Sequence, residues 1–424
     1  FQVRMKLLIY ILTFLSYSNA LAKELVYVQA LWRHGDRAPD QLPYPLDNYA
    51  EDYWEKGWGQ LTNMGIQELF DLGVFFADRY TGNLVNSSYN HNEIYVRSSD
   101  VDRTLASAQS FLNGMFPPTG YEQWNPKINW QPIPVHANTP NTFDPLLNPA
   151  GVDCPKYDDL WNNKYNPLIT DEIQQKYGPV FKMLEETTGY SNDLIIKKAM
   201  SLNDINQEMI HNLTQPEWIT MEWLEYDNNS TLDIITEIYR LRRTAQFKSP
   251  DLAKLRGGVI VRDFIDRLLD ASKGIFNEAT KMILYSGHDN TFFSLMYNMG
   301  IGDHQVVPHA AAVIFELYRD TNDEYTVEIL YKKNDEITQL TVPGCDRTCE
   351  VQKFHDLLKD QTYSSPEKMY DDCGTNTYLK LISKNNEATD RKSEILDSAQ
   401  NASRQTRISF YFLLIIYIFK FISK

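Results

Sequence analysis

The sequence is poor in cysteine and has no long apolar run. Four cysteines occur in 424 residues. The apolar stretches near the two ends are shorter than the ~20 residues that a membrane span usually needs. A glycine-rich phosphate loop, an HExxH or CxxC motif and an aspartate cluster with metal-ligand spacing are all missing. The sequence therefore predicts neither a bound metal ion nor a backbone cradle for phosphate.

Positive charge is also in deficit. The chain has 56 acidic and 41 basic residues, which gives a net charge of -15 and a pI of about 5.0. No basic stripe interleaved with aromatic residues appears, so nucleic acid is not expected as a partner. An acidic surface repels polyanionic substrates at neutral pH, and does so less at low pH.

The most informative motif is RHGDRAP at 33–39, which follows an apolar run at 25–32 that predicts a buried strand. Arg33 and Arg37 lie close to His34, and two neighbouring cations oppose protonation of an imidazole. Neutral imidazole is a nucleophile, and arginine is suited to bidentate binding of phosphate. Taken alone, the motif is explained equally well as a solvated basic turn.

Two further strand ends carry polar side chains. The apolar run at 281–287 leads to His288 and Asp289, and a second short strand ends at Arg97. Open α/β sheets bind ligands at the carboxyl ends of their strands, so we expect these groups to meet at one site. Each feature alone is better explained as a buried pair or a surface charge. Their combination favours a functional site.

Together these segments resemble the histidine acid phosphatase family, in its prostatic and lysosomal branch. The resemblance runs from about residue 24 to about residue 375, and RHGxRxP with a distant HD is a specific combination. The matching segments are RHGDRAP at 33–39, WGQLT at 58–62, IYVRSSDVDRTLASA at 94–108, WQPIPVH at 130–136, YSGHDNT at 285–291 and PGCDRTC at 343–349.

The resemblance implies an acid phosphatase that hydrolyses small phosphomonoesters through a phosphohistidine intermediate, without a cofactor or metal. His34 would be the nucleophile, and Asp289 would protonate the leaving group and then help to activate water. The groups implied to hold the phosphoryl oxygens are Arg33, Arg37, Arg97 and His288. No catalytic role is assigned to Asp100 or Asp102, and Arg103 is left open.

Two alternative functions are considered. An inositol-polyphosphate phosphatase would need many extra lysines and arginines around the pocket, and this acidic chain shows no such cluster. A catalytically silent secreted binding protein on the same fold would be favoured by loss of His34, an arginine or Asp289. All of these are present, so the enzyme is favoured.

The expected fold is a mixed α/β sheet flanked by helices, with a smaller helical insertion above the site. The catalytic domain is assigned to residues 23–139 and 248–380. The insertion is assigned to residues 140–247, which show helical patterns and no clear strands. The family fold implies the same arrangement.

Both ends of the chain carry targeting features. Residues 5–22 have a charged start, a short apolar core and a small-residue cleavage site, which predicts a signal peptide. Residues 384–407 read as a polar linker, and residues 408–419 as a hydrophobic segment. This last segment is explained either as a thin membrane span or as a lipid-anchor signal. We expect the secretory pathway, with an extracellular, lysosomal or membrane-anchored destination.

Other features fit secretion. Glycosylation sequons occur at Asn86, Asn212, Asn228, Asn229 and Asn401. Four cysteines allow three pairings, and Cys345 and Cys349 are close enough to clip a turn. The resemblance supports this pair together with Cys154–Cys373.

The family resemblance also bears on oligomerisation. The segment at 130–136 matches a family region associated with a subunit interface, so Trp130 and His136 are candidates for a homodimer contact. Alternatively, Trp130 belongs to the core and His136 to the surface. No functional role is expected for the remaining histidines, which are His91, His211, His304, His309 and His355.

Overall fold

A seven-stranded sheet is the central element of the structure, a computed structural model that describes residues 23–138, 142–191 and 196–375. The strands run in the order β2-β5-β1-β6-β7-β8, and β9 pairs with β7. Their bounds are β1 (Glu24–Arg33), β2 (Ile94–Ser98), β5 (Met282–Gly287), β6 (Ala312–Arg319), β7 (Tyr325–Lys333), β8 (Glu336–Leu340) and β9 (Cys349–Glu350). Both β1 and β2 pair with β5 in parallel, whereas β6 is antiparallel to β1. The carboxyl ends of β1, β2 and β5 therefore meet at one edge of the sheet.

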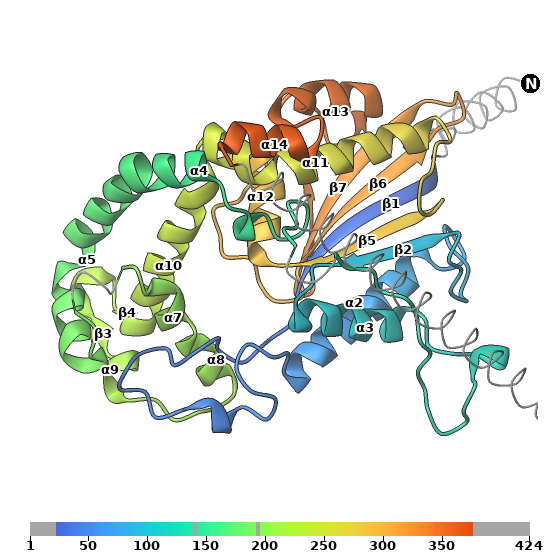
Figure 1. Cartoon of the computed structure of the whole chain (residues 1–424). Coiled ribbons are helices and arrows are strands. Elements are labelled where there is room, and N and C mark those ends of the chain that lie inside the picture. Colours follow the sequence, from blue (N-terminus) through green and yellow to red (C-terminus); the bar gives the residue numbers. More distant parts are fainter. Residues whose placement is uncertain (1–22, 139–141, 192–195, 376–424) are drawn as a thin grey trace, which may run out of the picture. The chain divides into compact units, whose positions relative to one another are not determined.

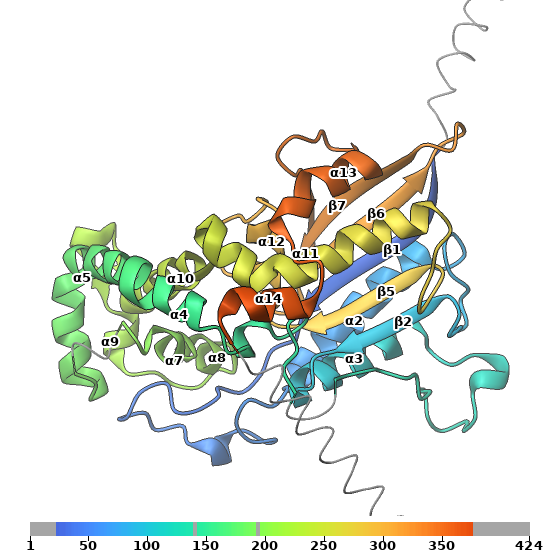
Figure 2. The same ribbon diagram turned by 45° about the horizontal axis from the view of Figure 1, so that its top comes forward.

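Helices cover both faces of this sheet (Figures 1 and 2). One face carries α2 (Asn63–Tyr80) and α3 (Asp102–Met115), and the other carries α11 (Pro250–Ser272), α12 (Asp289–Asn298) and α13 (Val351–Leu358). Along β5, Met282 and Leu284 pack into the core under α2 and α3. Ile283 and Tyr285 pack into the core under α11, α12 and α13. A strand covered on both faces reads as an unbroken apolar run, as 281–287 does. The predicted fold class, a mixed sheet flanked by helices, is confirmed.

A largely helical segment lies between β2 and β5 in sequence and has its own apolar core. Its helices are α4 (Pro155–Leu160), α5 (Asn166–Thr188), α7 (Ala199–Asn203), α8 (Ile205–Ile210), α9 (Glu217–Thr220) and α10 (Thr231–Lys248), and a π-helical turn at Trp161–Tyr165 joins α4 to α5. The expectation that this region lacks strands is wrong in one detail. Strands β3 (Glu222–Trp223) and β4 (Asn229–Ser230) form a small antiparallel sheet.

The remaining helical turns are short. Five are 3-10 turns, at Glu51–Tyr53, Gly120–Glu122, Pro149–Gly151, Leu224–Tyr226 and Lys359–Gln361. The last element is the short α-helix α14 (Pro366–Cys373). The described residues up to Cys373 belong to one compact unit. The division into a catalytic domain at 23–139 and 248–380 and an insertion at 140–247 stays a prediction.

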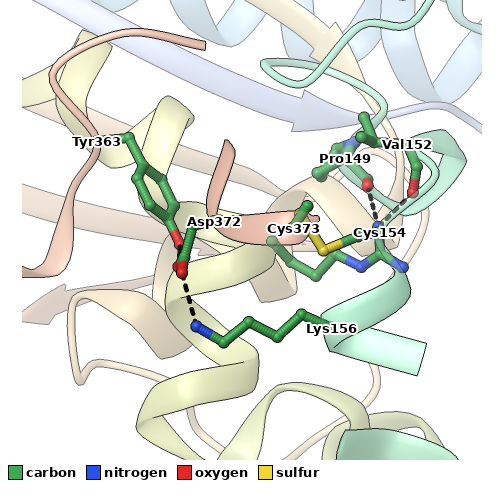
Figure 3. Close-up of a disulfide and its surroundings, with 8 residues drawn as sticks. Pro149, Val152, Cys154, Lys156, Tyr363, Asp372 and Cys373 are labelled. Carbon is green, nitrogen blue, oxygen red and sulfur yellow. Dashed lines mark hydrogen bonds and ion pairs between the residues drawn. A yellow bond between two sulfur atoms is a disulfide. The ribbon is translucent and has the colours of Figure 1, made fainter. Parts of the chain in front are cut away.

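Two disulfides join the four cysteines. One links Cys345 to Cys349, and the other links Cys154, which precedes α4, to Cys373 at the end of α14. Figure 3 shows the second disulfide beside an ion pair in which Lys156 Nζ lies 2.6 Å from Asp372 Oδ1. The two cysteines are 219 residues apart, so the bond closes a long loop of the chain.

Several predictions fall outside the described residues. These are the signal peptide at 5–22, the linker at 384–407, the hydrophobic segment at 408–419 and the sequon at Asn401. Within the described ranges, no helix is long and apolar enough to span a membrane. The other four sequon asparagines, Asn86, Asn212, Asn228 and Asn229, are all exposed, and their glycosylation stays a prediction.

The candidate interface residues lie at the surface. Trp130 is 38% exposed, so the alternative that places it in the core is wrong. His136 stacks on Tyr95 with ring centroids 4.6 Å apart, and its backbone pairs with β2. Dimerisation through this segment stays a prediction.

Helix α2 approaches the RHGDRAP motif more closely than side chains would permit. Thr62 caps the helix by accepting a hydrogen bond from the Gly65 amide, and its hydroxyl donates to Asp36 Oδ2 at 2.6 Å. A Cβ atom on Gly65 would lie 2.1 Å from the Asp36 carbonyl oxygen, and one on Gly35 would lie 2.3 Å from the Gly65 carbonyl oxygen. The motif is therefore held in place by direct backbone packing against α2.

We expect Gly65→Ala to lower the free energy of unfolding and to impair the motif. Because the atom in the way belongs to backbone, the helix or the loop must shift, and overpacking of this kind typically costs about 1–3 kcal/mol. The matched control is Gly178→Ala in α5, where an added Cβ has nothing within 4 Å. Denaturant unfolding of both variants checks this expectation, and equal stabilities would contradict it.

Candidate active site

His34 follows the last residue of β1 and is almost fully buried, with 3% of its surface exposed. Its Nδ1 lies 2.8 Å from the Gly35 carbonyl oxygen. Because a carbonyl can only accept, Nδ1 carries the proton and Nε2 keeps a free lone pair. Burial and the neighbouring charge of Arg33 lower the pKa of His34 well below its ordinary value. The ring is therefore neutral, and Nε2 is available as a nucleophile.

His288 stands beside His34 because their strands are adjacent. The His34 amide donates to the Gly287 carbonyl at 3.0 Å, which joins the ends of β1 and β5, and the two imidazole centroids are 5.6 Å apart. His288 Nε2 lies 2.9 Å from Ser99 Oγ. Burial and the charge of Arg103 lower the pKa of His288 to about 3, so this ring is also neutral under mildly acidic conditions.

Asp289 opens α12 and is held by a second helix. Arg243 of α10 donates to both carboxylate oxygens, at 3.0 Å to Oδ1 and 3.2 Å to Oδ2. The Tyr239 hydroxyl donates to Oδ2 at 3.1 Å, and the Asn290 amide donates to Oδ1 at 2.7 Å. Asp289 is therefore positioned jointly by the end of β5 and by α10.

These groups surround a cavity of about 230 Å³. The charged and titratable side chains that line it are Arg33, His34, Arg37, Arg103, Arg243, His288, Asp40, Asp204 and Asp289. Five of the six residues implied by the family resemblance, all except Arg97, are thus brought together in one place. The cationic groups come from a strand end, a loop and two helices that are far apart in sequence.

Two of the arginines keep donors without a partner. The Nε atoms of Arg33 and Arg103 are buried and have no hydrogen-bond partner among the described residues. Arg37 Nη2 lies 3.4 Å from both Asp204 and Asp40. The positive charge of Arg33 and Arg103 on the wall of the cavity favours an anion inside it.

The expectation that Arg97 binds substrate does not fit the structure. Arg97 Nη2 bonds Asp144 at 3.0 Å and Asn138 at 2.8 Å, and Arg97 does not line the cavity. The reason is alternation along β2, where Val96 joins the core beneath α2 and α3 and its neighbour Arg97 leaves the sheet on the other face. Arg103, in the first turn of α3, occupies the cavity instead.

His309, for which the sequence predicts no functional role, packs against His34. Its ring centroid is 5.7 Å from that of His34, and its Nδ1 is 3.7 Å from Asp36 Oδ1. Asp36 Oδ2 also lies 2.6 Å from His211 Nε2. Burial and Arg33 lower the pKa of His309 well below its ordinary value. No local motif marks His309, which precedes β6 and reaches His34 only through sheet pairing.

Residues 24–332 match the family model of the histidine phosphatase superfamily (branch 2). The chain therefore belongs to this family. It is 35% identical to the prostatic acid phosphatase of Rattus norvegicus over 343 residues, which cover 80% of this chain and 86% of that protein. It is also 35% identical to the human lysosomal acid phosphatase over 339 residues, which cover 78% and 77% of the two chains.

Solved structures with the same fold include phytases. The Hafnia alvei phytase in its apo form has a TM-score of 0.60 and 15% sequence identity, with 80% of this chain and 97% of that chain covered. The Klebsiella sp. ASR1 phytase has a TM-score of 0.58 and 17% identity, with 80% and 96% covered. At these identities the likeness concerns the fold alone.

The predicted family and enzyme class are confirmed: the chain is an acid phosphatase acting on phosphoric monoesters.

We expect Arg103 and Arg97 to differ sharply on substitution. Removing one group that stabilises transition-state charge typically costs about 10²–10³ in turnover, so Arg103→Met should lower kcat/KM by this order. Arg97→Met removes the same charge outside the cavity, so it should lower kcat/KM far less than Arg103→Met and should mainly reduce stability, because it leaves the buried Asp144 unpaired. Initial rates with 4-nitrophenyl phosphate measure both. A larger loss for Arg97→Met would contradict this assignment.

Proposed function

We propose that His34 attacks the phosphorus of a bound phosphomonoester and becomes transiently phosphorylated. One observation supports this role above all: the buried, neutral imidazole has Nδ1 bound to the Gly35 carbonyl, which leaves Nε2 as its reactive atom. Covalent catalysis of this kind divides one difficult hydrolysis into two easier displacements. The phosphoryl group would sit between His34 and the arginines of the cavity.

The phosphoryl oxygens would be bound by Arg33, Arg37, Arg103 and His288. Phosphoryl transfer depends on positioning and on stabilising the charge spread over the three equatorial oxygens. Fixed guanidinium groups at low local dielectric supply this stabilisation without reorganisation. The position of Arg33 and Arg103 on the wall of the same cavity as His34 supports their part in this binding. Arg103 takes the role that the resemblance had implied for Arg97.

Asp289 would deliver the proton that the leaving oxygen needs and would accept one from water in the second displacement. Its position at the start of α12, next to His288 and on the wall of the same cavity, supports this assignment. A group that donates in the first half and accepts in the second returns to its starting state after each turnover.

Small phosphomonoesters fit this cavity better than inositol polyphosphates. Four arginines line it, but the carboxylates of Asp40 and Asp204 line it as well and lie within 3.4 Å of Arg37. Net positive charge therefore suffices for one phosphate and not for several. The low pKa values of both imidazoles keep the rings neutral as the pH falls, which supports activity in acid.

A trapping experiment tests the role of His34. Rapid quenching during turnover of a ³²P-labelled phosphomonoester should leave an acid-labile, alkali-stable label on the wild-type chain, as expected for phosphohistidine. His34→Ala should lose both the label and turnover, whereas His91→Ala, at an exposed position, should keep both. Undiminished labelling of His34→Ala would overturn the assignment.

We further propose that residues 5–22 direct the chain into the secretory pathway and that residues 408–419 attach it to a membrane. The similarity to prostatic and lysosomal acid phosphatases supports the secretory route, and the sequence pattern alone supports the attachment. Truncation at about residue 384 should release active enzyme into the medium of expressing cells. Full-length enzyme found equally in the medium would contradict membrane attachment.

Phospholipase treatment of cells expressing the full-length chain separates the two modes of attachment. Release into the medium is expected for a lipid anchor, and retention is expected for a membrane span.

A further inference from the structure

The carboxylate of Asp289 is fully bonded in a way that the proposed reaction does not explain. Arg243 forks across both oxygens, and Tyr239 and the Asn290 amide supply two more hydrogen bonds. Arg243 and Tyr239 are buried, with 8% and 6% of their surfaces exposed. Both belong to α10, outside the family motifs that build the rest of the site. Every one of these partners is a donor, so the geometry selects the ionised form of Asp289.

Most other charged groups around Asp289 act in the same direction, whereas the carboxylates of Asp40 and Asp204 line the same cavity, oppose it and are paired with Arg37. Arg33 and Arg37 face it from β1 and the following loop, Arg103 faces it from α3, and His288 and His309 are neutral neighbours. Burial alone would raise the pKa of Asp289. The charges of Arg243 and Arg33, with the hydrogen bonds from Arg243 and the Asn290 amide, instead hold that pKa below its ordinary range.

An ionised carboxylate is suited to one of its two proposed tasks and not to the other. In the second displacement Asp289 must accept a proton from water, which requires an unprotonated carboxylate. An ordinary aspartate has a pKa near ~3.9, and burial pushes it upward, so such a base would be partly protonated in acid. Arg243 counteracts this loss in the medium in which an acid phosphatase works.

We propose that Arg243 is a positioning residue that keeps Asp289 a carboxylate in acid, so that the phosphohistidine is hydrolysed at low pH and the leaving-group proton enters with the substrate. This inference rests on the proposed function of His34 and Asp289. A residue of α10, which is not part of the sheet, would thus determine the protonation state of Asp289, whereas the proposed nucleophile lies at the end of a strand.

The proton balance closes with a monoanionic ester, the form that prevails below the second phosphate pKa of about 6. His34 Nε2 forms the bond to phosphorus while the bond from phosphorus to the leaving oxygen breaks. The electron pair of that bond stays on the leaving oxygen. The phosphoryl O–H proton passes to Asp289 and on to this oxygen, which departs as an alcohol.

Water then attacks phosphorus and gives one proton to Asp289. The bond between phosphorus and nitrogen breaks, and its electron pair returns to His34. Phosphate regains the proton from Asp289 and leaves as a monoanion, which restores both the neutral imidazole and the carboxylate.

The test measures hydrolysis of the phosphoenzyme directly as a function of pH. Full-length enzyme is labelled with a ³²P-phosphomonoester and shifted to between about pH 3.5 and about pH 7, and the loss of label is followed by rapid quench. Wild-type decay should stay level as the pH falls to about 4. An opposite charge at this distance typically lowers a carboxyl pKa by about 1–3 units. Arg243→Met should therefore show decay that falls tenfold per pH unit below a midpoint raised by about 1–3 units.

Three further variants separate charge from packing. Arg243→Lys keeps the charge and should restore most of the wild-type pH profile. Tyr239→Phe removes one hydrogen bond and should shift the midpoint upward by less than Arg243→Met does. Arg240→Met, on the same helix but paired with Glu237, should leave the profile unchanged. If Arg243→Met does not fold, Arg243→Gln also removes the charge and carries the same expectation.

Each outcome bears on one inference only. Decay that is slower by the same factor at every pH in Arg243→Met would overturn the role of Arg243 and leave it a packing residue. A wild-type chain that forms no labelled histidine would refute the proposed function of His34 instead. A raised midpoint in Arg243→Met that reverts in Arg243→Lys supports the inference.

Discussion

The parallel pairing of β1 with β5 is the interaction on which the site depends. In this register Arg33 lies opposite Gly287, so His34 and His288 follow their strands side by side at one edge of the sheet. The apolar side chains of the two strands alternate between two cores of different shape, so a shift of one residue would exchange the side chains that pack in each core. Burial of the strands in the two cores thus stabilises the fold and positions the two imidazoles together.

Charge is distributed unevenly over this chain. Its net charge is -15, yet four arginines line a single cavity of about 230 Å³. Bringing them together is unfavourable unless anions compensate, and Asp40, Asp204 and Asp289 do so in part. The remaining positive potential suits one phosphoryl group. The same charges lower the pKa of the buried imidazoles, so the groups proposed to bind phosphate also favour the neutral form of His34.

The sequence predicts the parts of this site that depend on local pattern. The strand expected at 25–32 is β1 (Glu24–Arg33), and the polar residues after β1 and β5 meet as expected because the strands are parallel. The expectation for Arg97 does not fit because side chains alternate along β2, and the sequence does not show which face of this strand borders the cavity. His309 and Arg243 reach the site from a loop and a helix placed by tertiary packing alone, and no spacing in the sequence indicates this.

The structure divides the work of the site between two sources. The ends of β1 and β5 supply Arg33, His34 and His288, and the placement of these residues follows from strand pairing. Helix α10 supplies Arg243 and Tyr239, which bond the carboxylate of Asp289 and determine its ionisation. Helix α10 contacts this part of the site through Asp289, which directly follows His288 in the sequence. The ionisation that we propose for Asp289 therefore depends on α10, whereas the placement of His34 beside His288 follows from the pairing of β1 with β5.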